Sequence, residues 1–282
     1  MSYSKDFRIG PDAKVRLKDF DPGFAGKHED KKAALERIEH LRQRMDDLQD
    51  ELYAEHKRSL LICLQALDAG GKDGVVRHVF RSMNPEGCRV ASFKEPSKEE
   101  LDHDFLWRIE HQTPRRGEVV IFNRSHYEDV LIVRVHELVP KKVWSKRYEQ
   151  INDFERRLAS NGTQILKFFL HISKEEQLQR FKQRLDDPSR QWKISEADYT
   201  ERECWSDYIR AYEDALSKCS TADAPWFVIP ANHKWFRDLA VSEIIVETME
   251  KLGISRPEPT VDIAEIRRKY HQTVKEEAVK KR

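Results

Sequence analysis

The chain has 282 residues, enough to bury a substantial hydrophobic core as one large domain or two small ones. Its 51 Lys and Arg residues against 50 Asp and Glu residues leave a formal net charge of +1. This balance argues against a general coat for nucleic acids and against a polybasic membrane anchor, so any polyanion must be bound by a local patch of charge.

The first 30 residues predict an irregular segment, because Pro11, Pro22, Gly23 and Gly26 interrupt them. The polar N-terminus lacks the apolar centre of a signal peptide, and no stretch approaches the roughly 20 apolar residues that span a bilayer. The cysteines show no Cys-x-x-Cys spacing, so we expect neither a zinc site nor a disulfide framework. A cytoplasmic location in a reducing compartment fits this cysteine usage best.

Helical and strand patterns alternate along the rest of the chain. Helices are expected over 31–56, 75–82, 98–112, 142–159, 175–185, 196–218 and 234–251, and strands over 60–67, 89–93, 118–122, 163–172 and 226–229. Alternation of this kind predicts an α/β fold, with a parallel sheet between two layers of helices.

Three parts of the chain are distinguished by these patterns. Residues 1–55 are expected to form an irregular segment and a helix packed on the core. Residues 56–255 would form the main domain, including a helical lid at about 174–217. Residues 256–282 are predicted to be a charged tail with a solvated helix.

The most informative stretch begins with the apolar run at residues 60–67. A loop of small residues with a Gly-Lys pair follows it, and then a helical pattern. This is the order of a phosphate-binding loop, where backbone N–H groups converge on an anion and the helix N-terminus adds partial positive charge. The expected phosphate contacts are Ala69, Gly70, Gly71, Lys72, Asp73 and Gly74.

This loop departs from the common pattern at both ends. The pattern begins with Gly, where this chain has Ala66, and ends with Ser or Thr, where it has Asp73. No hydroxyl therefore follows Lys72 to bind Mg²⁺, but the carboxylate of Asp68 lies inside the loop. A carboxylate there repels phosphate unless a cation lies between them, so we expect Asp68 to hold Mg²⁺. The alternative is a plain strand-to-helix turn with a surface Asp and Lys.

A polar block, residues 123–129, follows the strand expected over 118–122. Ligands of open α/β sheets bind beyond the carboxyl ends of strands, so this block should face the loop. Arg124 offers a planar pair of donors to phosphate oxygens, and Asn123 stands where an acid would ordinarily help to hold Mg²⁺. Glu128 and Asp129 are the nearest replacement carboxylates. Without the first loop, a polar connection with an N-capping Asn or Ser would be the better interpretation.

A third block is basic. Arg180, Lys182 and Arg184 belong to the helix expected over 175–185, and Lys193 follows a turn at 186–189. Basic side chains on a mobile helical pair could close over phosphates and exclude water, as lids do in phosphotransferases. The acids in the same stretch also fit an ordinary solvated helix face, which is the commoner origin of such a run.

Together these blocks resemble the polyphosphate kinase 2 family. The resemblance is carried by residues 66–74, 122–128 and 191–193, extends to 167–172 and 224–231, and spans roughly residues 30–250. It implies a three-layer α/β/α P-loop kinase fold of the thymidylate-kinase type with a helical lid. It also implies Mg²⁺-dependent phosphoryl transfer between inorganic polyphosphate and nucleotides, AMP to ADP and ADP to ATP, by a homo-oligomer that is a dimer or a tetramer.

The resemblance also assigns roles to individual residues. Asp68 matches the family's essential Walker A carboxylate, Lys72 its phosphate-binding lysine and Arg124 its Walker B arginine. Asn123 departs from the Asp that many members carry and resembles the subgroup that accepts both AMP and ADP, in which Glu128 lies nearby. An amide cannot accept a proton, which counts against acid–base chemistry at Asn123. Further polyphosphate contacts are expected at Arg77, His78 and Arg134.

Two other functions fit part of the sequence. The loop alone does not separate a polyphosphate-dependent enzyme from an ATP-dependent kinase of a small metabolite. A non-enzymatic nucleic-acid-binding protein would carry a basic stripe with aromatic residues for base stacking, which the balanced charge does not favour. We therefore expect neither a nucleic acid nor a membrane as a partner.

Overall fold

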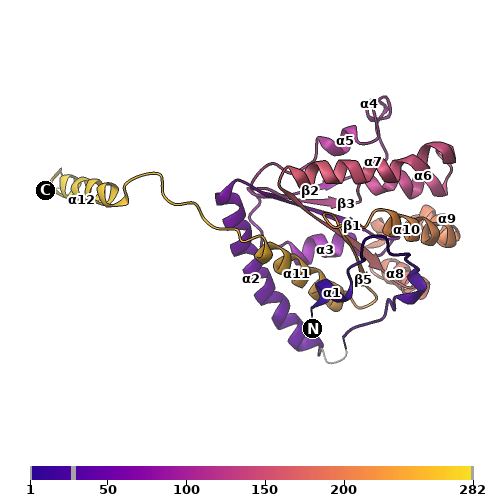
Figure 1. Cartoon of the computed structure of the whole chain (residues 1–282). Coiled ribbons are helices and arrows are strands. Elements are labelled where there is room, and N and C mark those ends of the chain that lie inside the picture. The colour runs from indigo at the N-terminus through magenta and orange to yellow at the C-terminus, as the bar shows by residue number, and fades with distance from the viewer. Residues whose placement is uncertain (1, 27–29, 281–282) are drawn as a thin grey trace.

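The computed structural model describes residues 2–26 and 30–280 (Figure 1). Within these residues, five parallel strands form one sheet in the order β2-β3-β1-β4-β5. They are β1 (Ser59–Gln65), β2 (Cys88–Ser92), β3 (Val119–Asn123), β4 (Thr163–His171) and β5 (Trp226–Pro230). The expected α/β class is therefore confirmed.

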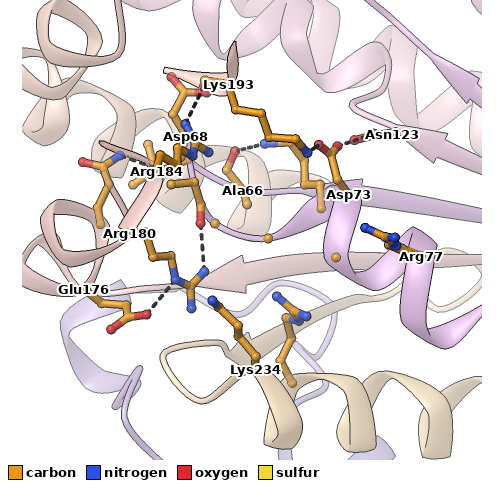
Figure 2. Close-up of a pocket in the computed structure, with 18 of the residues that line it drawn as sticks. Ala66, Asp68, Asp73, Arg77, Asn123, Glu176, Arg180, Arg184, Lys193 and Lys234 are labelled. Carbon is orange, nitrogen blue, oxygen red and sulfur yellow. Dashed lines mark hydrogen bonds and ion pairs between the residues drawn. The ribbon is translucent and has the colours of Figure 1, made fainter. Parts of the chain in front are cut away.

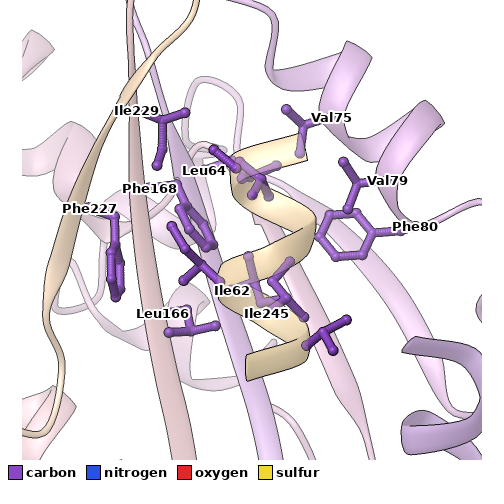
Figure 3. Close-up of a cluster of buried hydrophobic side chains, with 14 of the residues drawn as sticks. Ile62, Leu64, Val75, Val79, Phe80, Leu166, Phe168, Phe227, Ile229 and Ile245 are labelled. Atoms are coloured by element: carbon purple, nitrogen blue, oxygen red, sulfur yellow. The ribbon is translucent and has the colours of Figure 1, made fainter. Parts of the chain in front are cut away.

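One face of the sheet is covered by α2 (Lys31–Glu55), α3 (Lys72–Val79) and α11 (Lys234–Lys251). Alternate side chains of a strand point to opposite faces, so Ile62 and Leu64 of β1 pack on this side with Phe168 of β4. Val79 of α3 and Ile245 of α11 lie against them (Figure 3). Burying each such side chain contributes about 1.5–3 kcal/mol to stability.

The opposite face is covered by α5 (Trp107–Glu110), α7 (Lys141–Ser160) and α10 (Trp205–Lys218). Leu61 and Cys63 of β1 and Phe122 of β3 pack there against Phe154 of α7. Because both faces are covered, every residue of β1 is buried. This explains why the strand has a continuous apolar pattern rather than an alternating one.

The prediction of one continuous helix over 98–112 is wrong. The chain forms two short helices there, α4 (Lys98–Leu101) and α5. The side chain of Asp104 accepts a hydrogen bond of 2.9 Å from the backbone N–H of Leu106, and an acid that caps the backbone in this way begins a new helix rather than continuing an old one. Leu101, at the end of α4, is 68% exposed.

The helix expected over 196–218 is also divided. It forms α9 (Glu196–Glu203) and α10, with Cys204 between them. The helix expected over 175–185 is α8 (Lys174–Asp186). The short elements η2 (His126–Val130), α6 (Ile132–Val135) and η3 (Gln191–Lys193) had no expected counterpart.

The N-terminal segment is less irregular than its Pro and Gly content predicts. It contains α1 (Tyr3–Asp6) and η1 (Leu17–Asp19) and buries several apolar side chains. The N–H of Ile9 donates to Trp226 O at 2.9 Å, and the N–H of Val228 donates to Phe7 O at 3.0 Å. The segment thereby covers the outer edge of β5, which would otherwise expose unpaired backbone groups.

The C-terminal helix α12 (Ile263–Lys280) lies at the end of an extended connection, away from the sheet (Figure 1). Ile263, Ile266, Tyr270 and Val274 of this helix are exposed, as expected for a solvated helix. In the part of the chain that the structure describes, no helix combines the length and apolarity that crossing a bilayer requires.

A buried histidine at the end of β4 should make stability depend on pH. Burial lowers the pKa of His171 from its ordinary value of 6.5 to about 4. The unfolded chain therefore takes up a proton near pH 6.5, whereas the folded chain resists it until about pH 4. The stability that neutral His171 contributes is fully present above both pKa values and is lost as the pH falls between them. The free energy of unfolding should therefore fall by about 2 kcal/mol between about pH 7 and pH 5.

Urea unfolding at the two pH values measures this loss. His171→Gln should remove it, and His271→Gln on exposed α12 should retain it. An unchanged pH dependence in His171→Gln would contradict the assignment.

Candidate functional site

The loop expected to bind phosphate lies at the carboxyl end of β1, the middle strand of the sheet. The chain crosses to β2 and β3 on one side of β1 and to β4 and β5 on the other, and ligand sites of open α/β sheets form at such a switch point. A cavity of about 1870 Å³ opens there. Its walls include residues 66–74 of the loop, the segment after β3 and the lid, which extends from α8 to α10 (Figure 2).

The loop backbone needs small residues for steric reasons. Gly71 has φ +105°, which L side chains rarely adopt. A Cβ on Gly70 would lie 2.4 Å from the Cβ of Ala66 and 2.8 Å from Leu67 O. With Ala instead of Gly at position 66, position 70 must therefore be Gly. Ala69 also has a positive φ of 57°.

Lys72 begins α3 and closes the loop. Its Nζ donates to Ala66 O at 2.7 Å, which joins the start of the loop to the start of the helix. Burial lowers the pKa of Lys72, and the neighbouring Arg124 lowers it further. Phosphate would stabilise the charged form of this lysine, since an opposite charge raises a depressed amine pKa.

The loop and the segment after β3 face each other, and Arg124 joins them. Its Nη2 lies 3.5 Å from Oδ1 of Asp68, and its backbone has φ +64°. Burial lowers the pKa of Arg124, but the negative charges of Glu128 and Asp68 outweigh burial and hold that pKa above its ordinary value. The structure thus brings Asp68, Arg124 and Glu128 together, as the sequence predicts.

Asp73 connects the loop to both neighbours. Asn123 Nδ2 donates to its Oδ1 at 3.0 Å, and Lys193 of the lid donates to its Oδ2 at 3.1 Å. Burial raises the pKa of Asp73, but these two hydrogen bonds outweigh it and the net pKa is lowered. Asp73, which stands where the common pattern has Ser or Thr, therefore joins the lid to the loop (Figure 2).

Arg180 differs from a mobile lid cation. It is 5% exposed, and its Nη1 donates a hydrogen bond to Ala69 O at 2.8 Å. Its Nη2 donates to Asn232 O at 3.2 Å, and its Nε donates to the carboxylate of Glu176 at 2.6 Å. The guanidinium is thus fixed between the loop and the end of β5. Arg184 donates to Lys193 O at 3.0 Å and lines the cavity from within the lid.

Arg77 and His78 line the cavity from α3, but two predicted contacts lie outside it. Lys182 is 74% exposed and pairs with Asp186. It points away because only residues three or four positions apart, such as Arg180 and Arg184, share a helix face. Arg134 donates to Asp214 at 2.6 Å and to the hydroxyl of Tyr148 at 3.1 Å. Neither residue is among those that line the cavity.

Two basic residues of α11 were missed. Lys234 and Arg237 line the cavity beside Arg180. Arg237 is 2% exposed and pairs with Asp238, and its NH1 would lie 2.1 Å from a Cβ on Gly71. Burial lowers the pKa of Lys234, and Arg180 lowers it further. The signal that could have found them is their place just after the carboxyl end of the last strand.

Comparison with known proteins gives the same assignment over most of the chain. A sequence model described as polyphosphate kinase 2 matches residues 28–257. The chain is 54% identical over 256 residues to the AMP/ADP-polyphosphate phosphotransferase of Meiothermus ruber, covering 90% of this chain and 96% of that one. It is 48% identical over 269 residues to the ADP-polyphosphate phosphotransferase of Rhodopseudomonas palustris, covering 91% and 93%.

The fold is shared as well. The crystal structure of polyphosphate kinase 2 from Arthrobacter aurescens TC1 superimposes with a TM-score of 0.93 at 42% identity, covering 96% of this chain and 97% of that one. The matched region contains the loop, the segment after β3 and the lid at once. Since the similarity extends over the whole cavity and the sheet beneath it, this chain belongs to the polyphosphate kinase 2 family.

Proposed function

We propose that this protein transfers a phosphoryl group between inorganic polyphosphate and nucleoside mono- or diphosphates, converting AMP to ADP and ADP to ATP. The observation that carries the proposal is the meeting of Asp68, Lys72 and Arg124 in one cavity beneath a lid. The two relatives are named as phosphotransferases of polyphosphate with AMP/ADP and of polyphosphate with ADP, which supports the choice of substrates.

Phosphoryl transfer requires mainly positioning and the stabilisation of negative charge. The loop amides and Lys72 would hold the phosphate chain, and Arg124 would neutralise charge on the transferred group. The acceptor is already an anionic nucleotide phosphate, so screening its charge matters more than removing a proton. This explains how Asn123, which cannot accept a proton, can stand in the site.

The residues of the cavity fit a magnesium ion. Mg²⁺ prefers oxygen ligands and is commonly held by one or two carboxylates together with substrate phosphates and water. Among the described residues no group of three or more His, Cys, Asp or Glu side chains could hold a metal by itself. Asp68 would therefore share the ion with the substrate, and Glu128 is the neighbouring carboxylate. When bound, Mg²⁺ would neutralise charge on the phosphate oxygens.

We further infer a homo-oligomer that acts in the cytoplasm, without nucleic acid or membrane partners. The four cysteines are free, which supports a reducing compartment. Light scattering of the purified chain tests whether it is a dimer or a tetramer.

The decisive experiment incubates the protein with AMP, polyphosphate and Mg²⁺ in the absence of ATP. We expect ADP to form first and ATP to follow, and EDTA to stop both. Formation of product only when ATP is the donor would instead indicate an ATP-dependent kinase.

Asp68→Asn and Lys72→Ala should each lower kcat at least a hundredfold, since removing one aligned charged group from such a site costs about 3 kcal/mol. Steady-state rates measure the effect, and urea unfolding checks that the fold persists. Lys251→Ala is the control, because this exposed lysine pairs with Glu247 at the far end of α11. A near-normal rate in either loop variant would remove the assignment.

Gly71→Ala tests the shape of the loop. The added methyl group would meet both the positive φ of 105° and the guanidinium of Arg237. We expect the loop to shift, kcat/KM for polyphosphate to fall at least tenfold, and the free energy of unfolding to fall by about 1–3 kcal/mol. Gly10→Ala is the control, because no neighbouring atom would lie within 4 Å of the added Cβ, and it should change neither quantity. Equal behaviour of the two variants would show that the loop does not need this conformation.

A further inference from the structure

Four buried polar side chains lie behind the segment that carries Arg124 and Glu128. They are Lys167 of β4, Glu155 of α7, and His126 and Tyr127 of η2, and each is fully buried. None of them lines the cavity. The proposed chemistry therefore leaves this group without a role.

Lys167 uses all of its donors. Its Nζ donates to Glu155 Oε2 at 2.5 Å, to the hydroxyl of Tyr127 at 2.8 Å and to Cys219 O at 2.6 Å. An ammonium has three N–H groups, so its hydrogen-bonding capacity is complete. β4 is thereby joined to α7 and to the segment after β3 through one atom.

Glu155 completes the network from the other side. Its Oε1 accepts from Tyr127 at 2.9 Å and bonds His126 Nε2 at 3.0 Å. Burial raises the pKa of Glu155, but Lys167 and His126 outweigh it and hold the pKa below its ordinary value. Glu155 is thus a carboxylate that binds two consecutive residues of η2.

These two residues follow a strained position. Arg124 has φ +64°, a conformation that costs about 1–3 kcal/mol for a non-glycine residue unless its surroundings fix it. Its N–H donates to Leu64 O at 3.2 Å on one side. On the other side, Ser125 accepts from Gln65 at 3.1 Å, and His126 and Tyr127 are held by Glu155. The backbone on both sides of Arg124 is therefore fixed.

We propose that Lys167, Glu155 and Tyr127 are positioning residues that hold Arg124 in its left-handed conformation, aimed at Asp68. This inference rests on the proposed function, in which Arg124 neutralises the transferred phosphoryl group. A buried ion pair is often no more stabilising than well-packed apolar residues. Its place between β4 and α7, in contact with two residues of η2, is explained by the geometry that it imposes on the segment.

Tyr127→Phe tests the proposal with a minimal change. It removes both hydrogen bonds of the hydroxyl but leaves Lys167 paired with Glu155. The matched control is Tyr148→Phe, since Tyr148 is also buried, at 4% exposed, and accepts one hydrogen bond from Arg134. We expect kcat to fall about tenfold or more in Tyr127→Phe, with KM for AMP within about twofold, because misplacing a transition-state group lowers kcat.

Amide hydrogen exchange provides a readout that does not depend on the reaction. The amides of residues 123–128 should exchange faster in Tyr127→Phe and at the wild-type rate in Tyr148→Phe. Unchanged exchange of these amides in Tyr127→Phe, or a wild-type kcat, would overturn the proposal. If the wild-type protein itself transfers nothing from polyphosphate to AMP, the proposed function fails, and the exchange comparison still decides the positioning role.

The double variant Lys167→Met/Glu155→Leu separates positioning from stability. It replaces the ion pair with apolar side chains of similar size and leaves Tyr127 and His126 without their acceptor. The single variant Lys167→Met leaves Glu155 buried without its cation and should lower the urea midpoint. We expect the double variant to regain part of that midpoint toward the wild-type value, while its kcat stays low. Recovery of both quantities together would show that the pair only stabilises the core.

Discussion

The site depends on how closely the loop backbone at residues 66–74 approaches its surroundings. Gly70 lies against Ala66, and Gly71 lies against the guanidinium of Arg237, with no room for a side chain at either position. This close approach fixes the course of the loop backbone at the end of a fully buried strand. The other parts of the cavity are arranged around that fixed backbone.

Charge in the cavity is arranged in two ways. Arg180 and Arg237 are buried cations that form ion pairs with Glu176 and Asp238. Their side chains therefore stay beside the loop whether or not a substrate is bound. Arg184 and Lys193 belong to the lid, and Lys193 contacts the loop through Asp73. The two buried arginines are therefore fixed in place by their partners, whereas the lid contact is an exposed ion pair of the kind that breaks at little cost.

Much of the site could be predicted because its signals are local. The strand, the glycine loop and Lys72 are consecutive, so their pattern predicts both the turn and the chemistry. The position of Asn123 and Arg124 directly after a strand places them at the same sheet edge as the loop. Arg134 was expected from the resemblance and Lys182 from the basic run of the lid, and the structure pairs them with Asp214 and Asp186 outside the cavity. Arg237 follows the carboxyl end of the last strand, which is a signal for the cavity, but its contact with Gly71 crosses more than 160 residues of sequence and no local pattern predicts it.

The sequence by itself determined the alternation of strands and helices, the strand-loop-helix order around residues 66–74 and the resemblance to a kinase family. These follow from periodicity and spacing, which are properties of neighbouring residues. Only the tertiary structure decided which cations face the loop, that Arg180 is fixed rather than mobile, and that Lys167 and Glu155 support the segment around Arg124. Those contacts join β4, α7, α8 and α11, and the packing of distant elements is set by the whole core rather than by any local pattern.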